Sequence, residues 1–322
     1  APNLVLTARH CVSRVEASPP MNCSSDGTTI SGGSVAQDYP ADKLGVIVGD
    51  GNTIRAKGTN IFRPAAKTLC NADISLMVLE QPITDVPIVQ LRLDAPVTQD
   101  ETVTATGWGL SNNSTGFTLR QRTDVPIVDL GPFQSTIDRT LGPNEFSIGE
   151  STCEGDSGGP IVDSKTGAVL GVVSRGGNLN PAAAPAYVKC VDAPGYKTVN
   201  LITRIGGFKE LIVSALSSVG TEPWVEGGPD PRKAKAGEAC TADDACSTGV
   251  CGTNKVCAAA CLPNGMACGA GLTCQANACQ PAPSEESSGC SASSRGSSSN
   301  AWILVWGAAI AAMISGRRKR AV

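Results

Sequence analysis

Eight residues near the middle of the chain constrain its fold and chemistry most: Cys153 to Pro160 read Cys-Glu-Gly-Asp-Ser-Gly-Gly-Pro. Glycines at positions 155, 158 and 159 let the backbone turn tightly and approach other groups closely, which side chains there would obstruct. The Ser157 hydroxyl becomes a strong nucleophile only beside a base, and backbone N–H groups must face the oxyanion that its attack creates. The plain alternative is a glycine-rich turn between two strands.

The base and its partner carboxylate lie upstream. His10 is the single histidine of the chain and lies in Leu-Thr-Ala-Arg-His-Cys. Asp73 lies in Asn-Ala-Asp-Ile-Ser-Leu, before an apolar run. A carboxylate in contact with a histidine fixes its tautomer and stabilises its charged form. An isolated histidine is usually structural, and one aspartate before a strand is common. The order of the three residues along the chain therefore decides whether they form a catalytic set.

The order His10, Asp73, Ser157 excludes two classes of hydrolase. The α/β-hydrolases have their histidine after the serine, and no histidine follows Ser157. The subtilisin order requires an acid before the histidine, and residues 1–9 contain none. The three segments together resemble the trypsin/chymotrypsin family of serine peptidases, with Arg9 where the family usually has a small residue.

This resemblance assigns roles to the matching residues. Ser157 would attack the scissile carbonyl, His10 would carry the proton, and Asp73 would orient His10. The N–H groups of Gly155 and Ser157 would form the oxyanion hole. By the same resemblance a disulfide joins Cys153 to Cys190 and braces the nucleophile loop.

Residues of the substrate pocket follow from the same resemblance. Ser151, six residues before Ser157, would lie at the base of the specificity pocket, where trypsin-like enzymes carry an aspartate, so a small or apolar substrate residue is favoured. Ser174 and Gly176 would belong to the strand that pairs with substrate, with Gly176 leaving the pocket open. Arg175 replaces the usual aromatic residue there; the alternative is that it is a solvated loop residue.

The family also implies activation by proteolysis, which makes the protein a zymogen. A new N-terminus, released by an activating protease, would pair with Asp156. Because the family places a strand and a turn before the His10 motif, and Cys11 has no upstream partner, we expect that the first residues of the enzyme precede this sequence. We therefore expect residues 1–322 alone to be inactive or poorly active.

Composition limits the partners and the compartment. The net charge is −3, which gives no argument for nucleic acid. The 14 cysteines indicate an oxidising compartment and a secreted or surface protein. With one histidine and no tight Cys-x-x-Cys pair, no metal and no cofactor is expected. Cys23 and Cys70 have no obvious role in the family, and the sequence leaves open whether they pair with each other.

Residues 1–219 read as many short strands separated by Gly, Pro, Asn and Asp. Together with the resemblance, they predict an all-β fold: two antiparallel six-stranded β-barrels, the first lacking its N-terminal part, and the active site in the cleft between them. One helix is expected near the end of this domain, where apolar residues recur at helical spacing. Thr203 is its expected cap and Gly220 its stop.

The remaining chain divides into four parts. Residues 220–239 form a linker, and 240–280 a disulfide-rich module, since it has few large apolar residues. Cysteines 240, 246 and 251 recur as 268, 274 and 279, so the module is an internal duplication whose pairing the sequence leaves open. The module would bind a cell-wall polymer or a protein, or act as a spacer. A Ser/Gly-rich linker (281–300) and a tail (301–322) follow.

The tail combines Cys290 upstream, an apolar run over 301–314 and a basic cluster at the C-terminus. The run spans about 21 Å as a helix, less than the roughly 30 Å hydrocarbon core. The arrangement nevertheless resembles the C-terminal sorting tags of myxobacterial surface proteins. It implies a transmembrane helix before processing at Cys290 by a sorting enzyme, with the basic end in the cytoplasm.

The sequence thus predicts a serine endopeptidase, a hydrolase of the EC 3.4.21 type, which acts on proteins or peptides through an acyl-enzyme. It would be secreted and displayed on a bacterial cell surface or anchored in the outer membrane. The alternative is a catalytically inactive surface protein that binds or adheres through its Cys-rich module.

Overall fold

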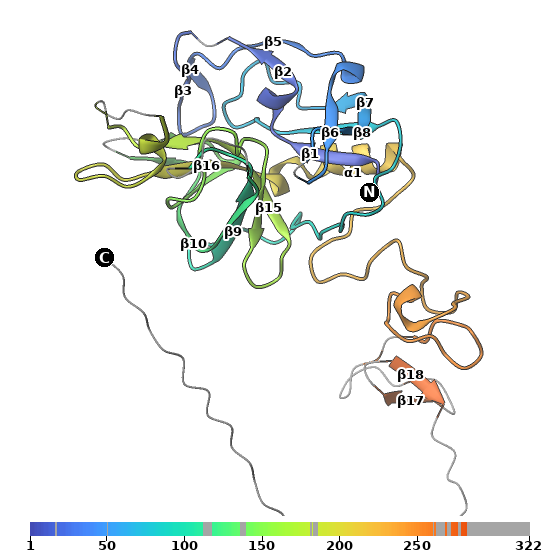
Figure 1. The fold of residues 1–322 in the computed structure, drawn as a ribbon. Coiled ribbons are helices and arrows are strands. Elements are labelled where there is room, and N and C mark those ends of the chain that lie inside the picture. The colour runs from blue at the N-terminus through green and yellow to red at the C-terminus, as the bar shows by residue number, and fades with distance from the viewer. Residues whose placement is uncertain are drawn as a thin grey trace, which may run out of the picture. The chain divides into compact units, whose positions relative to one another are not determined.

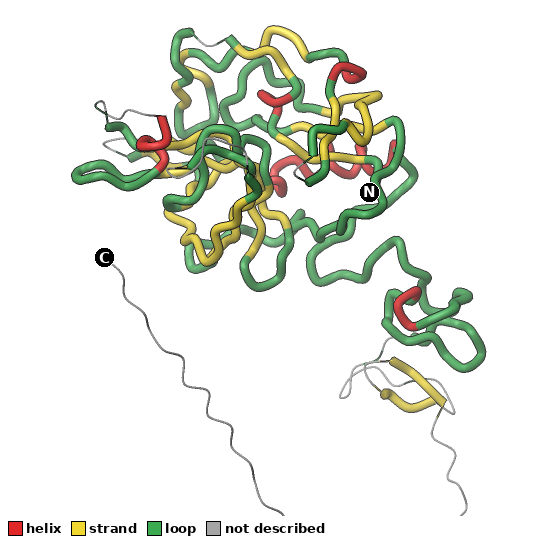
Figure 2. The backbone as a smooth tube through the Cα atoms, viewed as in Figure 1, coloured by secondary structure: helices red, strands yellow, loops and turns green. Residues whose placement is uncertain are grey.

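The computed structural model describes residues 1–281 except 17, 50, 112–117, 136–139, 181, 183–185, 260, 262–267, 269–271 and 276–277, and the side chains of 186 and 187. Strands and loops make up most of this part (Figures 1 and 2), as the sequence predicts. The predicted tail, its Cys290 and nearly all of the linker before it lie outside the described residues.

A closed antiparallel barrel encloses one of the apolar clusters of the fold. Its strands follow the order β10 (Arg120–Leu130), β13 (Glu145–Ile148), β16 (Val199–Arg204), β15 (Val169–Gly177), β14 (Pro160–Asp163) and β9 (Thr102–Gly107). Branched and aromatic side chains favour strands and fill the barrel interior. The buried core comprises Val97, Val103, Ala105, Val125, Ile127, Phe146, Ile148, Ile161, Leu170, Val173 and Ile202.

The first predicted barrel is present as an open four-stranded antiparallel sheet. Its order is β1 (Leu4–Thr7), β8 (Ser75–Leu79), β7 (Ile54–Phe62) and β6 (Gly45–Ile47). Ile74 and Leu76 share a buried cluster with Val172 of the closed barrel. The sheet and the barrel therefore pack against each other, and segments from both reach their junction.

One α-helix, α1 (Lys209–Ser218), follows the last barrel strand. It buries Ile212, Ala215 and Leu216 in the cluster shared with β8 and β15. Gly220, with φ at +72°, ends it: the Gly220 N–H donates to Ser217 and the next N–H to Leu216, a Schellman motif. The predicted cap Thr203 is wrong, because Thr203 lies within β16 and pairs across the barrel.

The other elements are short. The two-stranded ribbons are β2 (Ser13–Val15) with β5 (Val35–Asp38), β3 (Asn22–Cys23) with β4 (Thr29–Ser31), β11 (Phe133–Gln134) with β12 (Thr140–Leu141), and β17 (Leu272–Gln275) with β18 (Ala278–Pro281). The 3₁₀ turns are η1 (Arg9–Cys11), η2 (Ala41–Lys43), η3 (Ala186–Cys190), η4 (Ile205–Phe208) and η5 (Asp243–Ala245).

The first half of the predicted linker lies along the domain formed by residues 1–219; we call residues 221–232 the strap. Leu91 donates its N–H to the Trp224 carbonyl, and Glu226 donates its own to the Leu91 carbonyl. The Glu226 carboxylate accepts from the buried Arg92 guanidinium, which also pairs with Glu101 and Asp163. Backbone pairing and a buried charge network thus hold the strap.

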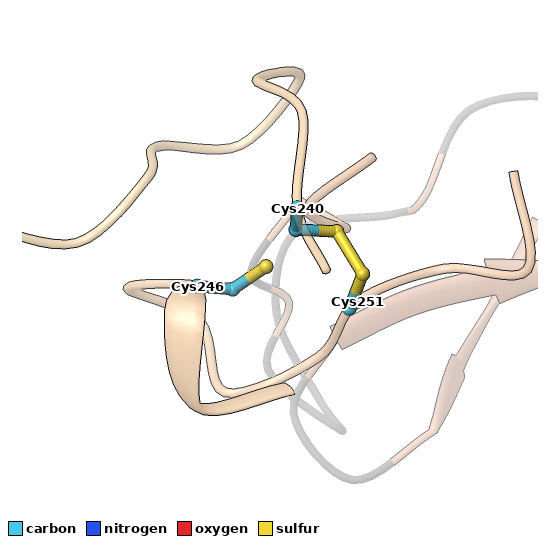
Figure 3. A group of neighbouring side chains, drawn as sticks. All are labelled: Cys240, Cys246 and Cys251. Atoms are coloured by element: carbon cyan, nitrogen blue, oxygen red, sulfur yellow. A yellow bond between two sulfur atoms is a disulfide. The ribbon is translucent and has the colours of Figure 1, made fainter. Parts of the chain in front are cut away.

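Four disulfides hold the Cys-rich module together. The pairs are Cys240–Cys251, Cys246–Cys257, Cys261–Cys274 and Cys268–Cys279. The first and last are related by the 28-residue repeat of the sequence, whereas Cys246 pairs downstream and its repeat counterpart Cys274 pairs upstream. The sulfurs of Cys240, Cys246 and Cys251 lie within 4.8 Å of one another, and the disulfide between two of them is drawn in Figure 3. Sulfurs in disulfides are not thiolates, the form that binds metals.

Among the described residues, we find no helix of sufficient length and apolar character to span a membrane.

Candidate active site

The pairing of β1 with β8 brings His10 and Asp73 together. β1 leads into η1, which carries His10, and Asp73 lies just before β8. The antiparallel register sets Thr7 opposite Ser75, so the segments beyond these residues meet at one end of the sheet. The His10 ring Nδ1 lies 2.7 Å from Asp73 Oδ2, and the His10 backbone N–H donates to Asp73 Oδ1 at 3.0 Å.

The Asp73 carboxylate is buried and fully engaged. Its side chain is 1% exposed, and the Ser174 hydroxyl donates to Oδ2 at 2.6 Å. Burial alone lowers the pKa of His10, but the hydrogen bond to Asp73 and the neighbouring Cys11 side chain outweigh burial and raise this pKa to about 10. The site therefore favours the imidazolium form of His10 strongly.

The loop that carries Ser157 lies against the segment before His10. A Cβ added at Gly158 would lie 2.3 Å from Thr7 Oγ1 and 2.9 Å from the Ala8 nitrogen. Because Gly158 also has φ at +76°, glycine is required for this approach. The Cys11 Sγ lies 3.6 Å from the Ser157 carbonyl oxygen. The structure thus brings the three predicted residues to the junction of sheet and barrel.

The Ser157 side chain is exposed and forms no hydrogen bond within the described part of the chain. Hydrogen bonds between catalytic groups are often loose without substrate and tighten when substrate binds. On the adjacent backbone, the Gly155 and Ser157 N–H groups likewise have no acceptor among the described residues, and Gly155 has φ at +97°.

The Asp156 carboxylate anchors the loop through two backbone hydrogen bonds. Its Oδ1 accepts the Gly109 N–H at 2.6 Å, and its Oδ2 accepts the Cys153 N–H at 2.8 Å. A Cβ at Gly107 would lie 2.0 Å from the same carboxylate, which explains why glycines flank Trp108. A cavity of about 250 Å³ adjoins Asp156.

Asn200, which the sequence analysis missed, contacts two residues predicted for the substrate pocket. It lies opposite Gly176 in the β15–β16 register, and a Cβ at Gly176 would lie 2.3 Å from its Oδ1. Its Nδ2 donates to the Gly149 carbonyl at 3.0 Å and to Ser151 Oγ at 3.4 Å. The space that Gly176 leaves is therefore occupied by a neutral amide beside Ser151, and no sequence motif marks Asn200.

Arg175 is not a solvated loop residue. Its side chain is 21% exposed, and its guanidinium forms a bidentate pair with Glu145 at 2.7 and 3.1 Å. Glu145 was also missed, because a single acid within an apolar strand carries no motif. Ser174, predicted to lie in the strand that pairs with substrate, uses its hydroxyl to hold Asp73, and its role toward substrate stays a prediction.

Two disulfides brace the site. Cys153 pairs with Cys190, as the resemblance implies, and Cys23 pairs with Cys70, which the sequence left open. The second bond links the loop after His10 to the segment before Asp73. Among the described cysteines, Cys11 keeps a free and exposed thiol.

Comparison with known proteins shows which family the chain belongs to. The family model described as Trypsin matches residues 1–193. A trypsin of Saccharopolyspora erythraea is 30% identical over 208 residues, which cover 59% of this chain and 78% of the relative. Trypsin 5G1 of Aedes aegypti is 29% identical over 147 residues, 42% of this chain and 54% of the relative. A snake venom serine protease of Trimeresurus stejnegeri is 32% identical over 149 residues, 41% of this chain and 56% of the relative. The chain therefore belongs to the trypsin family of serine peptidases.

Proposed function

We propose that the protein is a serine endopeptidase in which Ser157 attacks the peptide carbonyl, His10 carries the proton and Asp73 orients His10. The observation that carries this proposal is the 2.7 Å contact between His10 Nδ1 and the buried Asp73 carboxylate. In the neutral form of His10, Nδ1 donates to Asp73, and Nε2 is the nitrogen that remains to accept a proton from Ser157.

The proposed reaction proceeds in two stages. Attack by Ser157 forms a tetrahedral intermediate, whose oxyanion accepts from the N–H groups of Gly155 and Ser157. His10 then donates its proton to the leaving amine, and an acyl-enzyme remains on Ser157. Water, deprotonated by His10, releases the acid product and regenerates the hydroxyl.

The pocket supports a preference for small, uncharged substrate residues before the cut. Ser151 and Asn200 are both neutral, so they offer no partner for Arg or Lys, and the Asn200 amide fills space beneath Gly176. Cleavage of a peptide library with positions before the cut varied would measure this preference. A dominant Arg or Lys would contradict it.

Activation through Asp156 is a further part of the proposal. The adjoining cavity of about 250 Å³ supports it, because Asp156 lines this cavity and a new N-terminus has room there to bring its ammonium to the carboxylate. Limited proteolysis of the full natural protein, followed by activity assays and N-terminal sequencing, tests this step. Activity that needs no new N-terminus would contradict it.

Surface display rests on the sequence of the tail alone. We propose that residues 301–314 hold the protein in a membrane until a sorting enzyme acts at Cys290. Mass spectrometry of protein released from the producing cells tests this proposal. A mature chain that still carries Arg320 would exclude processing.

Steady-state hydrolysis of peptides by the full natural protein tests the central proposal. Ser157→Ala should lower kcat about a million-fold. Ser218→Ala, which removes a hydroxyl at the end of α1, is the matched control and should leave kcat unchanged. Hydrolysis at the background rate by the wild type and both variants would favour the alternative of an inactive binding protein. Hydrolysis at the wild-type rate by both variants would show that Ser157 is not the nucleophile.

A further inference from the structure

We propose that Glu145 and Arg175 form a positioning pair that couples the Asp73 loop to the substrate-binding strand β15. The proposal rests on the proposed function, because the coupled groups are the orienting carboxylate and the strand edge that would meet substrate. Neither residue touches the reacting atoms, so each would act through its neighbours.

Glu145 lies in barrel strand β13, and both of its carboxylate oxygens accept hydrogen bonds. Its side chain is 0% exposed. Oε1 accepts the Asn71 N–H at 3.2 Å, and Oε2 accepts the Gly142 N–H at 2.9 Å. Each oxygen also accepts from the Arg175 guanidinium. A glutamine would replace one of these acceptors by an NH₂ donor that faces another donor, so a carboxylate is required.

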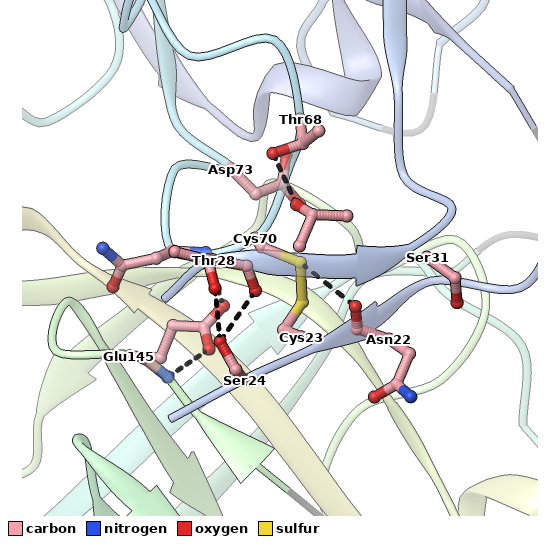
Figure 4. The surroundings of a disulfide bond; sticks show 12 residues. Asn22, Cys23, Ser24, Thr28, Ser31, Thr68, Cys70, Asp73 and Glu145 are labelled. Carbon is pink, nitrogen blue, oxygen red and sulfur yellow. Dashed lines mark hydrogen bonds between the residues drawn. A yellow bond between two sulfur atoms is a disulfide. The ribbon is translucent and has the colours of Figure 1, made fainter. Parts of the chain in front are cut away.

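Asn71 transmits this anchor to Asp73, two residues later. Its backbone φ of +59° is uncommon for a residue other than glycine. Its Oδ1 accepts the Asn144 N–H at 2.5 Å, beside Glu145 in the chain. Cys70 on the other side of Asn71 is fixed by its disulfide to Cys23. Figure 4 shows this disulfide near Asp73 and Glu145.

Arg175 closes the connection from the opposite side. It follows Ser174, whose hydroxyl donates to Asp73 Oδ2 at 2.6 Å. One Nη of Arg175 also lies 3.8 Å from Cys23 Sγ. Thus β15 contacts the Asp73 loop directly through Ser174 and indirectly through Arg175, Glu145 and Asn71. A displacement of β15 cannot occur without a change at Asp73, which makes the orientation of His10 sensitive to how β15 is held.

The pair is more than a stabilising ion pair because of its geometry. Arg presents a planar fork that matches a carboxylate, and Lys does not. If Arg175 loses its charge, the Glu145 carboxylate is left buried without a cation, and both of its hydrogen bonds to β15 are lost. The Asp73 loop should then loosen although no residue in it has been changed.

The experiment compares Arg175→Met and Arg175→Lys with Arg92→Met in the full natural protein. Arg92 is the matched control: it is also buried and paired with carboxylates, but it belongs to the strap network. Hydrogen exchange of the amides in residues 69–75, kcat and KM are measured for each. Exchange reports the coupling even in a protein that proves to hydrolyse nothing.

For Arg175→Met we expect exchange in residues 69–75 to accelerate at least about tenfold. Displacement of a positioned group costs up to about a hundredfold in rate, so kcat should fall about tenfold to a hundredfold. Arg175→Lys should fall between Arg175→Met and wild type, and Glu145→Gln should resemble Arg175→Met. Adding Glu145→Gln to Arg175→Met should have little further effect, because one connection is already broken.

Arg92→Met should lower stability but leave exchange in residues 69–75 and kcat unchanged. The proposal is overturned if Arg175→Met and Arg92→Met have the same effect on exchange and kcat. A wild-type protein without Ser157 reactivity would instead overturn the proposed function, while the exchange result would still decide the coupling. If Arg175→Met fails to fold, Arg175→Lys and Glu145→Gln decide by the same two measurements.

Discussion

The closed barrel and the Cys-rich module are stabilised by opposite means. The barrel encloses a continuous apolar cluster around Phe146 and Ile202, and its six strands pair around the full circle. The buried cluster at the start of the module consists of Cys240, Cys246 and Cys257, with Ala234, Ala245 and Cys251 around it. Its core is thus made mainly of the cross-links themselves. Within one chain, hydrophobic burial is therefore the main contribution in the barrel and disulfides are the main contribution in the module.

Deleting the largest fully buried side chain of the barrel should have the largest effect on stability. Phe146→Ala should lower the free energy of unfolding by about 3–5 kcal/mol, because it removes buried apolar area and leaves a cavity. Urea unfolding followed by circular dichroism measures the change. Leu179→Ala, at a side chain that is 63% exposed, is the control. A similar loss in both would contradict the contrast between core and surface.

Removing one cross-link should unfold the first half of the module and spare the barrel. Cys246→Ser combined with Cys257→Ser removes a bond that stabilises by about 3 kcal/mol through restriction of the unfolded chain. Hydrogen exchange should show loss of protection over residues 240–257 and unchanged protection in the barrel strands. A module that keeps its protection would show that it has a core independent of disulfides.

The protonation of His10, at the junction of sheet and barrel, should determine how activity depends on pH. Since the pKa of His10 is raised to about 10 and the proposed base is neutral, kcat/KM should rise about tenfold per pH unit from pH 7 towards this pKa. Conversely, stability from the charged His10–Asp73 pair is full below pH 6.5 and is lost as pH rises through about 10. A pH profile of kcat/KM that is flat above pH 7 would contradict this assignment.

Acid should weaken the strap before it affects the module. The hydrogen bond from Arg92 lowers the pKa of Glu226 below its ordinary value of 4.5. A lowered pKa contributes stability that is present above pH 4.5 and is lost as pH falls through the folded value. Trp224 fluorescence, followed from pH 6 to about pH 3, should report release of the strap. Glu226→Gln should remove this transition; an unchanged transition would assign it to another group.

The smallest effect is expected for an apolar side chain of the module. Leu272 is 40% exposed and lies in the β17–β18 ribbon, so Leu272→Ala should change stability by less than about 0.5 kcal/mol. Thermal unfolding with the disulfides intact measures this. A loss comparable to that of Phe146→Ala would mean that the module relies on apolar packing after all.

Local patterns predicted the elements that carry a motif or a regular period. The apolar spacing from Phe208 to Leu216 predicted α1, and the segments around His10 and Asp73 predicted a meeting that the β1–β8 register produces. Thr203 failed as a cap because pairing within the barrel took precedence over local capping chemistry. Propensity is routinely overridden in this way by tertiary structure.

Asn200 and Glu145 could not be predicted from their neighbours in sequence. Asn200 reaches the pocket only because the β15–β16 register sets it opposite Gly176. Glu145 pairs with Arg175, which lies thirty residues away in the chain, and accepts a hydrogen bond from Asn71, which lies still further away. Such contacts depend on strand order and register, which no single segment encodes. The pairing within the Cys-rich module was open for the same reason.

Fluorophosphonate labelling of the full-length natural protein, with the adduct mapped by mass spectrometry, tests the central claim most directly. The account predicts one adduct, on Ser157, that disappears in the His10→Ala variant, because the hydroxyl reacts only when a base accepts its proton. No adduct on Ser157, even after limited proteolysis has released a new N-terminus, would contradict the peptidase mechanism and direct attention to the Cys-rich module.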